Sequence, residues 1–190
     1  ALEPSDQQEA YDMGAYGFAL SEKLGLPVMV RMVTRLAHSR AVVEVEGNAA
    51  AENQLSYPQK ARQWVLMPGN SRVRYRELLA QKDDMERLSE ESPFNRLIPG
   101  TDTRIGILAS GIAYNYVNEA FAGRCPFPVL KISQYPLPKK LVAQLADTCD
   151  AILVIEEGQP VIEECMRGLL DRGLKIYGKL DGHLPLSLIH

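Results

Sequence analysis

An alternation of short apolar runs with helical patterns constrains this chain most. Residues 104–121, RIGILASGIAYNYVNEAF, combine an apolar run with a tight turn and a helix whose apolar residues recur at helical spacing. Three further apolar runs follow, at residues 127–132, 151–155 and 174–177. Strands that alternate with helices of about 10–12 residues are typical of βαβ units. The sequence therefore predicts an α/β fold, a mostly parallel sheet covered by helices on both faces.

Composition excludes several classes of protein. Of the 190 residues 46% are hydrophobic and 24% are charged, and the net charge of -3 offers no basic field for nucleic acid or a membrane surface. No apolar run approaches the roughly 20 residues of a membrane-spanning helix. Cys125, Cys149 and Cys165 are widely spaced and form no C-x-x-C motif, so neither a zinc nor an iron–sulfur site is predicted. We expect small core cysteines in a reducing cytoplasm.

The first segment predicts one helix and one strand. Ser5 is a candidate N-cap with Gln8 completing a capping box, and the helix would run to about Leu24. The apolar run Val28–Val33 predicts a strand. The residues expected to face inward from the helix are Ala10, Met13, Phe18 and Leu24. One helix and one strand cannot make a domain, and the chain does not begin with Met, so we expect the end of a longer domain here.

The middle of the chain is less regular. Residues 44–63 are acidic and alanine-rich, which is typical of an exposed connection between domains. Residues 64–67, WVLM, predict a short strand that ends at Pro68. Ser71 then predicts the start of a long polar helix to about Ser89 with a narrow apolar stripe.

Polar residues at the carboxyl ends of the predicted strands are candidates for a site, because ligands of open α/β sheets lie there. One such end is Ser110 and Gly111, where a single glycine does not make a dinucleotide-binding pattern. Another is Glu156 and Glu157. They would serve acid–base chemistry or have a structural, helix-dipole role, and adjacent strand residues point to opposite faces, so they form no predicted dyad.

A second candidate cluster follows the predicted strand at residues 28–33. Arg35, His38 and Ser39 would either hold a carboxylate substrate or form a salt bridge at a domain edge, and the residues alone leave both open. No nucleophile elbow, phosphate-binding loop or metal-binding motif is present in the sequence. We therefore predict no catalytic residue and no metal ligand.

Several separate stretches resemble one family. They are residues 3–10, 27–39, 92–96, 106–116, 135–138, 156–157 and 178–182. Together they resemble the 2-oxoacid:ferredoxin oxidoreductases, and most of all the alpha subunits of the indolepyruvate ferredoxin oxidoreductases. The resemblance covers nearly the whole chain.

The resemblance implies a division of the chain. Residues 1–45 would end a thiamine-diphosphate pyrimidine-binding domain, 46–63 would be a linker, 64–182 a transketolase C-terminal-like domain, and 183–190 a tail. That domain would hold a five-stranded sheet with one antiparallel edge strand, which residues 64–67 fit. The intact enzyme of this family oxidatively decarboxylates arylpyruvates to acyl-coenzyme A and passes electrons through iron–sulfur clusters to ferredoxin, with a beta subunit as partner.

The family's glutamate that activates thiamine diphosphate, its magnesium-binding domain and its cysteine clusters have no counterpart in this sequence. We therefore expect a scaffold that by itself binds no thiamine diphosphate, magnesium or iron–sulfur cluster and self-associates through residues 1–45. The alternative is a stand-alone flavodoxin-like ligand-binding or regulatory module, which would bury Met13, Phe18 and residues 28–33 against its own sheet. A flavin carrier needs a longer phosphate-binding loop than residues 109–111 offer.

Overall fold

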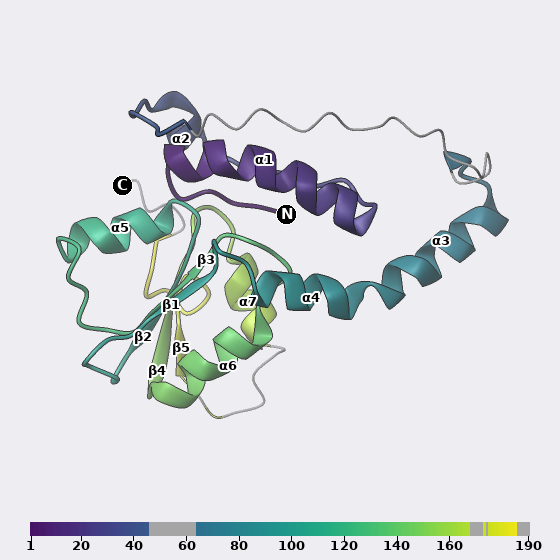
Figure 1. The fold of residues 1–190 in the computed structure, drawn as a ribbon. Helices are drawn as coiled ribbons and strands as arrows, with labels where there is room; N and C mark the ends of the chain where they lie inside the picture. Colours follow the sequence, from purple (N-terminus) through teal and green to yellow (C-terminus); the bar gives the residue numbers. More distant parts are fainter. Residues whose placement is uncertain (46–63, 168–172, 174, 186–190) are drawn as a thin grey trace.

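The computed structural model describes residues 1–45, 64–167, 173 and 175–185 (Figure 1). The predicted linker, residues 46–63, lies outside the described residues, as do residues 186–190 of the predicted tail. Within the described ranges no helix is both long and apolar enough to cross a membrane.

The centre of the fold is a five-stranded sheet with the order β1-β3-β2-β4-β5. Its strands are β1 (Arg96–Ile98), β2 (Gly106–Ser110), β3 (Val129–Ile132), β4 (Ala151–Ile155) and β5 (Lys175–Tyr177). Strands β2 to β5 pair in parallel, and β1 pairs antiparallel with β3. Every residue of β2 is buried, as its central place in the sheet requires. The mostly parallel five-stranded α/β sheet predicted above is confirmed.

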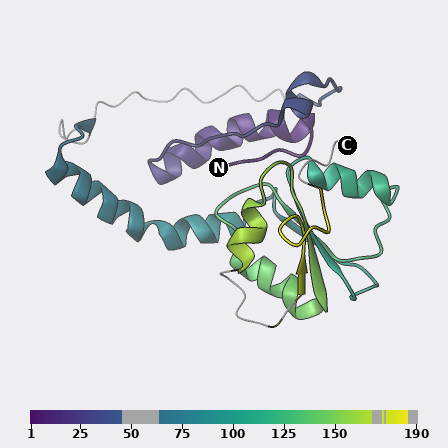
Figure 2. The same cartoon turned by 180° about the vertical axis from the view of Figure 1, so that it is seen from behind.

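Helices cover both faces of the sheet (Figures 1 and 2). Leu108 faces α6 (Lys139–Thr148) and α7 (Val161–Arg167), in a core that also holds Leu145. Its neighbour Ile107 faces the opposite way and packs with Val117 of α5 (Ala113–Ala120). Because consecutive strand residues point to opposite faces, these two cores define three layers.

The antiparallel edge strand is β1, so the assignment of residues 64–67 to that strand is wrong. Residues 64–67 pair with no strand within the described chain. All four are exposed, at the far end of α3 (Pro68–Ala80) from the sheet (Figure 1). Apolar composition alone does not make a strand, because a strand also needs a neighbour to satisfy its backbone groups.

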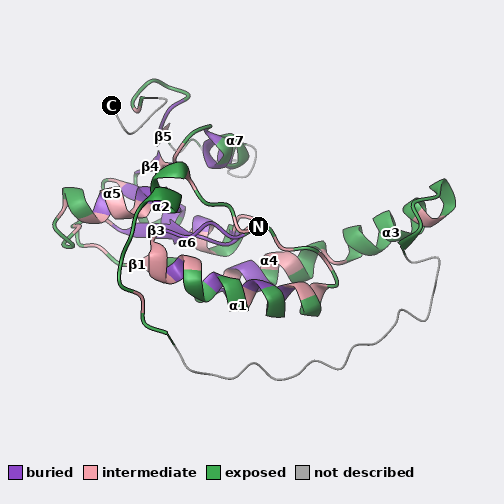
Figure 3. Ribbon diagram, turned by 90° about the horizontal axis from the view of Figure 1, so that it is seen from above, coloured by how far each residue is buried: buried purple, intermediate pink, exposed green. Residues whose placement is uncertain are grey.

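The long helix predicted over residues 71–89 is two helices. It begins earlier, at Pro68 in the first turn of α3, and is interrupted at Gln81 before α4 (Lys82–Glu90). Helix α4 packs beside α6, whereas α3 has no buried residue and projects from the body of the protein (Figure 3).

The first helix is α1 (Gln7–Leu24), whose N-cap is Asp6 and not the predicted Ser5. The Asp6 carboxylate accepts the backbone N–H of Glu9 at 2.8 Å. Ser5 instead donates both its N–H and its hydroxyl to the Glu9 carboxylate, at 2.9 and 2.7 Å. The helix is therefore capped one residue later than predicted, with Asp6 in place of Ser5 as N-cap and Glu9 in place of Gln8 as the residue that reaches back.

In the part of the chain that the structure describes, the predicted strand at residues 28–33 is reduced to a single bridge between Val30 and Leu2. Met13 and Leu2 are fully buried in a second core with Leu88 of α4. Phe18, however, is 81% exposed, so its predicted inward orientation is wrong. A short helix, α2 (Thr34–His38), follows the bridge.

Candidate functional site

The carboxyl ends of the central strands are covered by the first residues of the chain. The backbone N–H of Glu3 donates to the carbonyl of Ser133 at 2.7 Å, and that of Tyr135 donates to the carbonyl of Ala1 at 2.9 Å. The Asn115 side chain donates to the carbonyl of Ser5 at 2.7 Å. The sheet edge where ligands bind in open α/β folds is therefore closed here by residues 1–5.

The Glu3 side chain lies at the centre of this closed edge. Its carboxylate accepts the Tyr135 hydroxyl at 2.8 Å and pairs with Arg31 at 3.4 Å, and only 4% of the side chain is exposed. Burial, and then the charge of Glu3, raise the pKa of Tyr135, so the phenol stays protonated and donates. Ser110 is buried near the same hydroxyl.

Gly111 leaves the space that the Glu3 side chain occupies. Its φ of 50° lies in the left-handed region, and a Cβ there would stand 2.6 Å from Cγ of Glu3. Gly111 thus has a conformational and a steric role.

Arg35, His38 and Ser39 do not converge on one point. The Ser39 hydroxyl accepts from Gln7 at 2.6 Å and donates to the carbonyl of Leu36 at 2.8 Å, so it ties α2 to α1. His38 is exposed. Arg35 reaches helix α5, where its guanidinium lies 5.4 Å from the centre of the Tyr116 ring.

Glu156 and Glu157 point in different directions. Glu156 is buried and accepts the backbone N–H groups of Ile162 and Glu163 at 2.9 and 3.1 Å, so it caps the start of α7. Burial raises the pKa of Glu156, and the two backbone donors offset part of that rise. Glu156 therefore lies against the first backbone N–H groups of α7, the position that a helix-dipole role would require.

Glu157 instead lies near Tyr116. Burial, followed by the charge of Glu157, raises the pKa of Tyr116, and Arg35 opposes this rise. The Tyr116 hydroxyl and Oε2 of Glu157 are buried, and neither has a hydrogen-bond partner among the described residues. Of the candidate residues, Arg35 and Glu157 are therefore brought together, across Tyr116.

The structure contains a buried ion pair between Glu9 and Lys131 that we did not predict from the sequence. Lys131 is fully buried in β3, binds the Glu9 carboxylate and lies 5.5 Å from the centre of the Tyr114 ring. Its ammonium also approaches the carbonyl of Phe94 at 3.3 Å. The available signal was a lysine inside an apolar strand, VLKI, because a charge there needs a buried partner.

A magnesium ion that holds thiamine diphosphate takes oxygen ligands such as carboxylates, and an iron–sulfur cluster takes cysteine thiolates. The carboxylates of Glu3, Glu9 and Glu156 each already accept the hydrogen bonds of neighbouring protein groups. No group of three or more His, Cys, Asp or Glu side chains that could hold a metal lies in the part of the chain that the structure describes.

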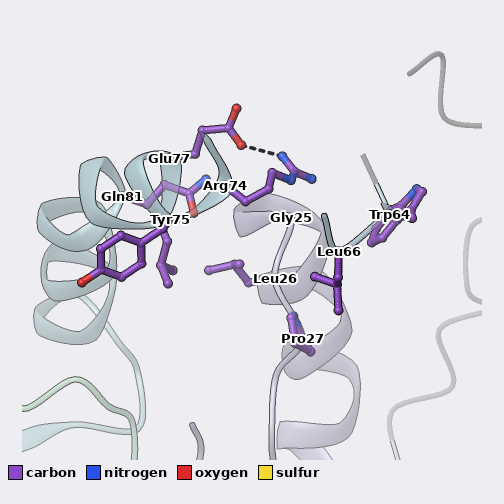
Figure 4. A pocket seen from close by; sticks show the side chains of 10 residues that line it. Gly25, Leu26, Pro27, Trp64, Leu66, Arg74, Tyr75, Glu77 and Gln81 are labelled. Atoms are coloured by element: carbon purple, nitrogen blue, oxygen red, sulfur yellow. Dashed lines mark hydrogen bonds and ion pairs between the residues drawn. The ribbon is translucent and has the colours of Figure 1, made fainter. Parts of the chain in front are cut away.

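Two cavities lie away from the sheet edge. One, of about 460 Å³, separates the C-terminal end of α1 from α3 and is largely apolar (Figure 4). The other, of about 300 Å³, lies between α5 and the sheet and is lined almost wholly by apolar side chains.

The fold is an α/β unit with a mostly parallel sheet, and comparison with known proteins gives its relatives. The chain is 36% identical to the indolepyruvate oxidoreductase subunit IorA of Methanothermobacter thermautotrophicus, covering 97% of this chain and 31% of that protein. It is 34% identical to the IorA subunit of Archaeoglobus fulgidus (98% and 30%) and to that of Pyrococcus abyssi (94% and 29%). The family resemblance is thereby confirmed: nearly all of the chain matches a part of the IorA subunits, and it spans less than a third of their length.

Two other comparisons add little. No protein-family model matches the chain. A solved structure of 2-oxoglutarate:ferredoxin oxidoreductase from Magnetococcus marinus, with 2-oxoglutarate, coenzyme A and succinyl-CoA bound, is 13% identical with a TM-score of 0.42. It covers 60% of this chain and 21% of the other, and a likeness of that degree carries no conclusion.

Proposed function

We propose that the chain is a scaffold and interface part of a thiamine-diphosphate-dependent 2-oxoacid:ferredoxin oxidoreductase. The enzyme would oxidatively decarboxylate indolepyruvate and related arylpyruvates to acyl-coenzyme A. The similarity of 97% of the chain to an indolepyruvate oxidoreductase subunit carries this proposal. In this reading residues 1–45 end the pyrimidine-binding domain, 46–63 link the domains, 64–182 form the transketolase C-terminal-like domain, and 183–190 are a tail.

The closed sheet edge supports a scaffold role over a catalytic one. Glu3 and Tyr135 join the first segment to the strand ends by a buried hydrogen bond, where a free ligand-binding module would leave its edge open. Within this reading Arg35, His38 and Ser39 face a substrate or a neighbouring domain. Arg35 is the best placed of them, beside Tyr116 and Glu157.

The cofactors and partners of such an enzyme would be held elsewhere. Thiamine diphosphate, magnesium and the iron–sulfur clusters would bind other parts of the alpha subunit. A beta subunit, ferredoxin and coenzyme A would complete the system in the cytoplasm. The chain by itself would then bind none of these cofactors tightly and would not turn over.

The alternative of a stand-alone flavodoxin-like ligand-binding or regulatory module is supported by one observation. Met13 is fully buried within the chain's own fold, as a complete module requires. Phe18 and Met29, however, are 81% and 62% exposed, as expected of a segment that another surface covers. The exposed residues and the closed strand ends both favour the scaffold.

An activity assay tests the proposed reaction. The complete gene product, purified without oxygen together with its partner subunit, would be mixed with indolepyruvate, coenzyme A and a viologen dye. We expect dye reduction that requires both indolepyruvate and coenzyme A. Absence of reduction with indolepyruvate, phenylpyruvate and other 2-oxoacids, in a preparation loaded with its cofactors, would contradict the proposal.

A further inference from the structure

The topology of the sheet marks one place where an open α/β fold takes its ligands. In the order β1-β3-β2-β4-β5, the chain leaves β2 through α5 on one face and leaves β4 through α7 on the other. Strands β2 and β4 are neighbours, so the topological switch point of the sheet lies between their carboxyl ends. Ligands of such sheets bind in the crevice outside this point.

The carboxylate of Glu3 lies at this switch point. A Cβ on Gly111, which follows β2, would stand 3.0 Å from Oε1 of Glu3. The same oxygen lies 3.4 Å from Nη1 of Arg31, and Nη2 of that guanidinium would stand 3.9 Å from a Cβ on Gly158, which follows β4. Tyr135, which follows β3, donates its hydroxyl to Oε2 at 2.8 Å. The carboxylate is therefore surrounded by groups at the carboxyl ends of the three central strands.

We propose that this place is a binding site for a small carboxylate, and that Glu3 fills it as an internal ligand, a ligand that the chain itself supplies. A guanidinium and a hydroxyl are donors that bind a free carboxylate equally well, and the turn at Gly111 gives them room. Truncation of Glu3 to alanine would remove one methylene and one carboxylate and keep both donors. Acetate has the same heavy atoms as the part removed, so acetate is the probe for the site.

The backbone holds the internal ligand in place from both sides. The N–H of Glu3 donates to the carbonyl of Ser133 at 2.7 Å. Two residues further on, the carbonyl of Ser5 accepts the side chain of Asn115 at 2.7 Å. A group on a short flexible tether already has an effective concentration in the millimolar range, and a well-oriented group has a far higher one. Free acetate should therefore not displace Glu3 from the wild-type protein, and the inference does not rest on the proposed oxidoreductase activity.

Thermal unfolding in acetate and in chloride, at equal ionic strength and pH, tests the site. Glu3→Ala should lower the Tm by about 3–12 °C in chloride, because a buried hydrogen bond to a charged group is lost. If acetate binds this variant with a Kd of about 10 mM, about 100 mM acetate should raise its Tm by about 3–6 °C. Isothermal titration of Glu3→Ala with acetate should give the same Kd.

Controls separate binding from a general effect of the salt. The wild type, and Glu22→Ala with its change at an exposed glutamate of α1, should show no difference between acetate and chloride. Acetamide has a similar shape without the charge and should not stabilise Glu3→Ala. Tyr135→Phe or Arg31→Met, each combined with Glu3→Ala, should abolish most of the response to acetate, because each removes one donor.

Refolding keeps the test decisive if Glu3→Ala does not fold in chloride. Dilution of that variant from urea into acetate should then restore the circular dichroism of the folded protein, and dilution into chloride should not. The absence of any acetate effect on Glu3→Ala, in unfolding and in refolding, would overturn the proposal. An equal effect on the wild type, or a response that persists without Tyr135 and Arg31, would overturn it as well, since acetate would then act elsewhere.

Discussion

Breaking the buried pair between Glu9 and Lys131 should destabilise the protein far more than removing both charges. Lys131 is fully buried, and without Glu9 its ammonium would keep, among the described residues, the Phe94 carbonyl at 3.3 Å and the Tyr114 ring. Removing one partner of a buried ion pair costs about 3–5 kcal/mol, and we expect Glu9→Gln to lie in that range. For a chain of 190 residues this corresponds to a Tm lower by about 6–20 °C.

The Lys131→Met variant should lose less unfolding free energy than Glu9→Gln, because Glu9 keeps other partners. In Lys131→Met its carboxylate would still accept two hydrogen bonds from Ser5, at 2.9 and 2.7 Å, with Arg96 at 3.7 Å. We therefore expect a loss of about 3 kcal/mol, at the low end of the range. The double variant Glu9→Gln with Lys131→Met should lie within about 1.5 kcal/mol of the wild type, because no unpaired charge remains.

Urea unfolding followed by circular dichroism measures all four proteins of this cycle. The expected coupling energy between the two positions is about 3 kcal/mol or more. The double variant keeps the test informative if a single variant fails to fold. Additive losses, with coupling below about 0.5 kcal/mol, would refute the claim that the two charges depend on each other.

The remaining predictions concern pH, glycines and buried acceptors. Burial alone would raise the pKa of Glu9, but Lys131 and Ser5 more than offset it and hold that pKa below its usual 4.5. The stability from Glu9 is thus present above about pH 4.5 and lost as pH falls through the lower folded pKa, and Glu9→Gln should flatten the acid limb of a stability–pH curve. Gly111→Ala should lower the unfolding free energy by about 1–3 kcal/mol, because of the positive φ and the contact with Glu3. Gly14→Ala, where a Cβ meets no atom, should instead raise the unfolding free energy by about 0.5–1 kcal/mol, and a loss at both positions would count against the steric argument. Glu156→Ala should lower stability by about 0.5–2 kcal/mol in urea unfolding, through loss of the α7 cap, and an unchanged midpoint would speak against that role.

The central fold could be predicted from the sequence because its signals are local. The run of residues 104–121 contains a strand, its turn and its helix within eighteen positions, and β2 and α5 form there. The end of each strand follows from the same local pattern, so Ser110, Gly111, Glu156 and Glu157 were placed at the correct edge of the sheet.

The contacts made at that edge could not be predicted, because they join residues far apart in the chain. Glu3 meets Tyr135, and Glu9 meets Lys131, across more than 120 positions. The antiparallel edge strand was misplaced for the same reason. Arg96–Ile98 is only three residues long, and its position is fixed by pairing with β3 rather than by its own composition.

The predicted orientation of the first helix is wrong for a related reason. Met13 and Phe18 are both apolar, and helical periodicity did not separate the row that packs on Leu88 and Leu2 from the row that remains exposed. Only the position of α1 over the rest of the fold makes that distinction.

The scaffold assignment is tested most directly by measuring cofactor binding to this chain and to the complete gene product side by side. Isothermal titration with thiamine diphosphate and magnesium should show tight, sub-micromolar binding to the complete protein with its partner subunit, and none to residues 1–190. Sub-micromolar binding to the isolated chain would contradict the account, because the strand ends closed by Glu3 and Tyr135 would then have to open for a ligand.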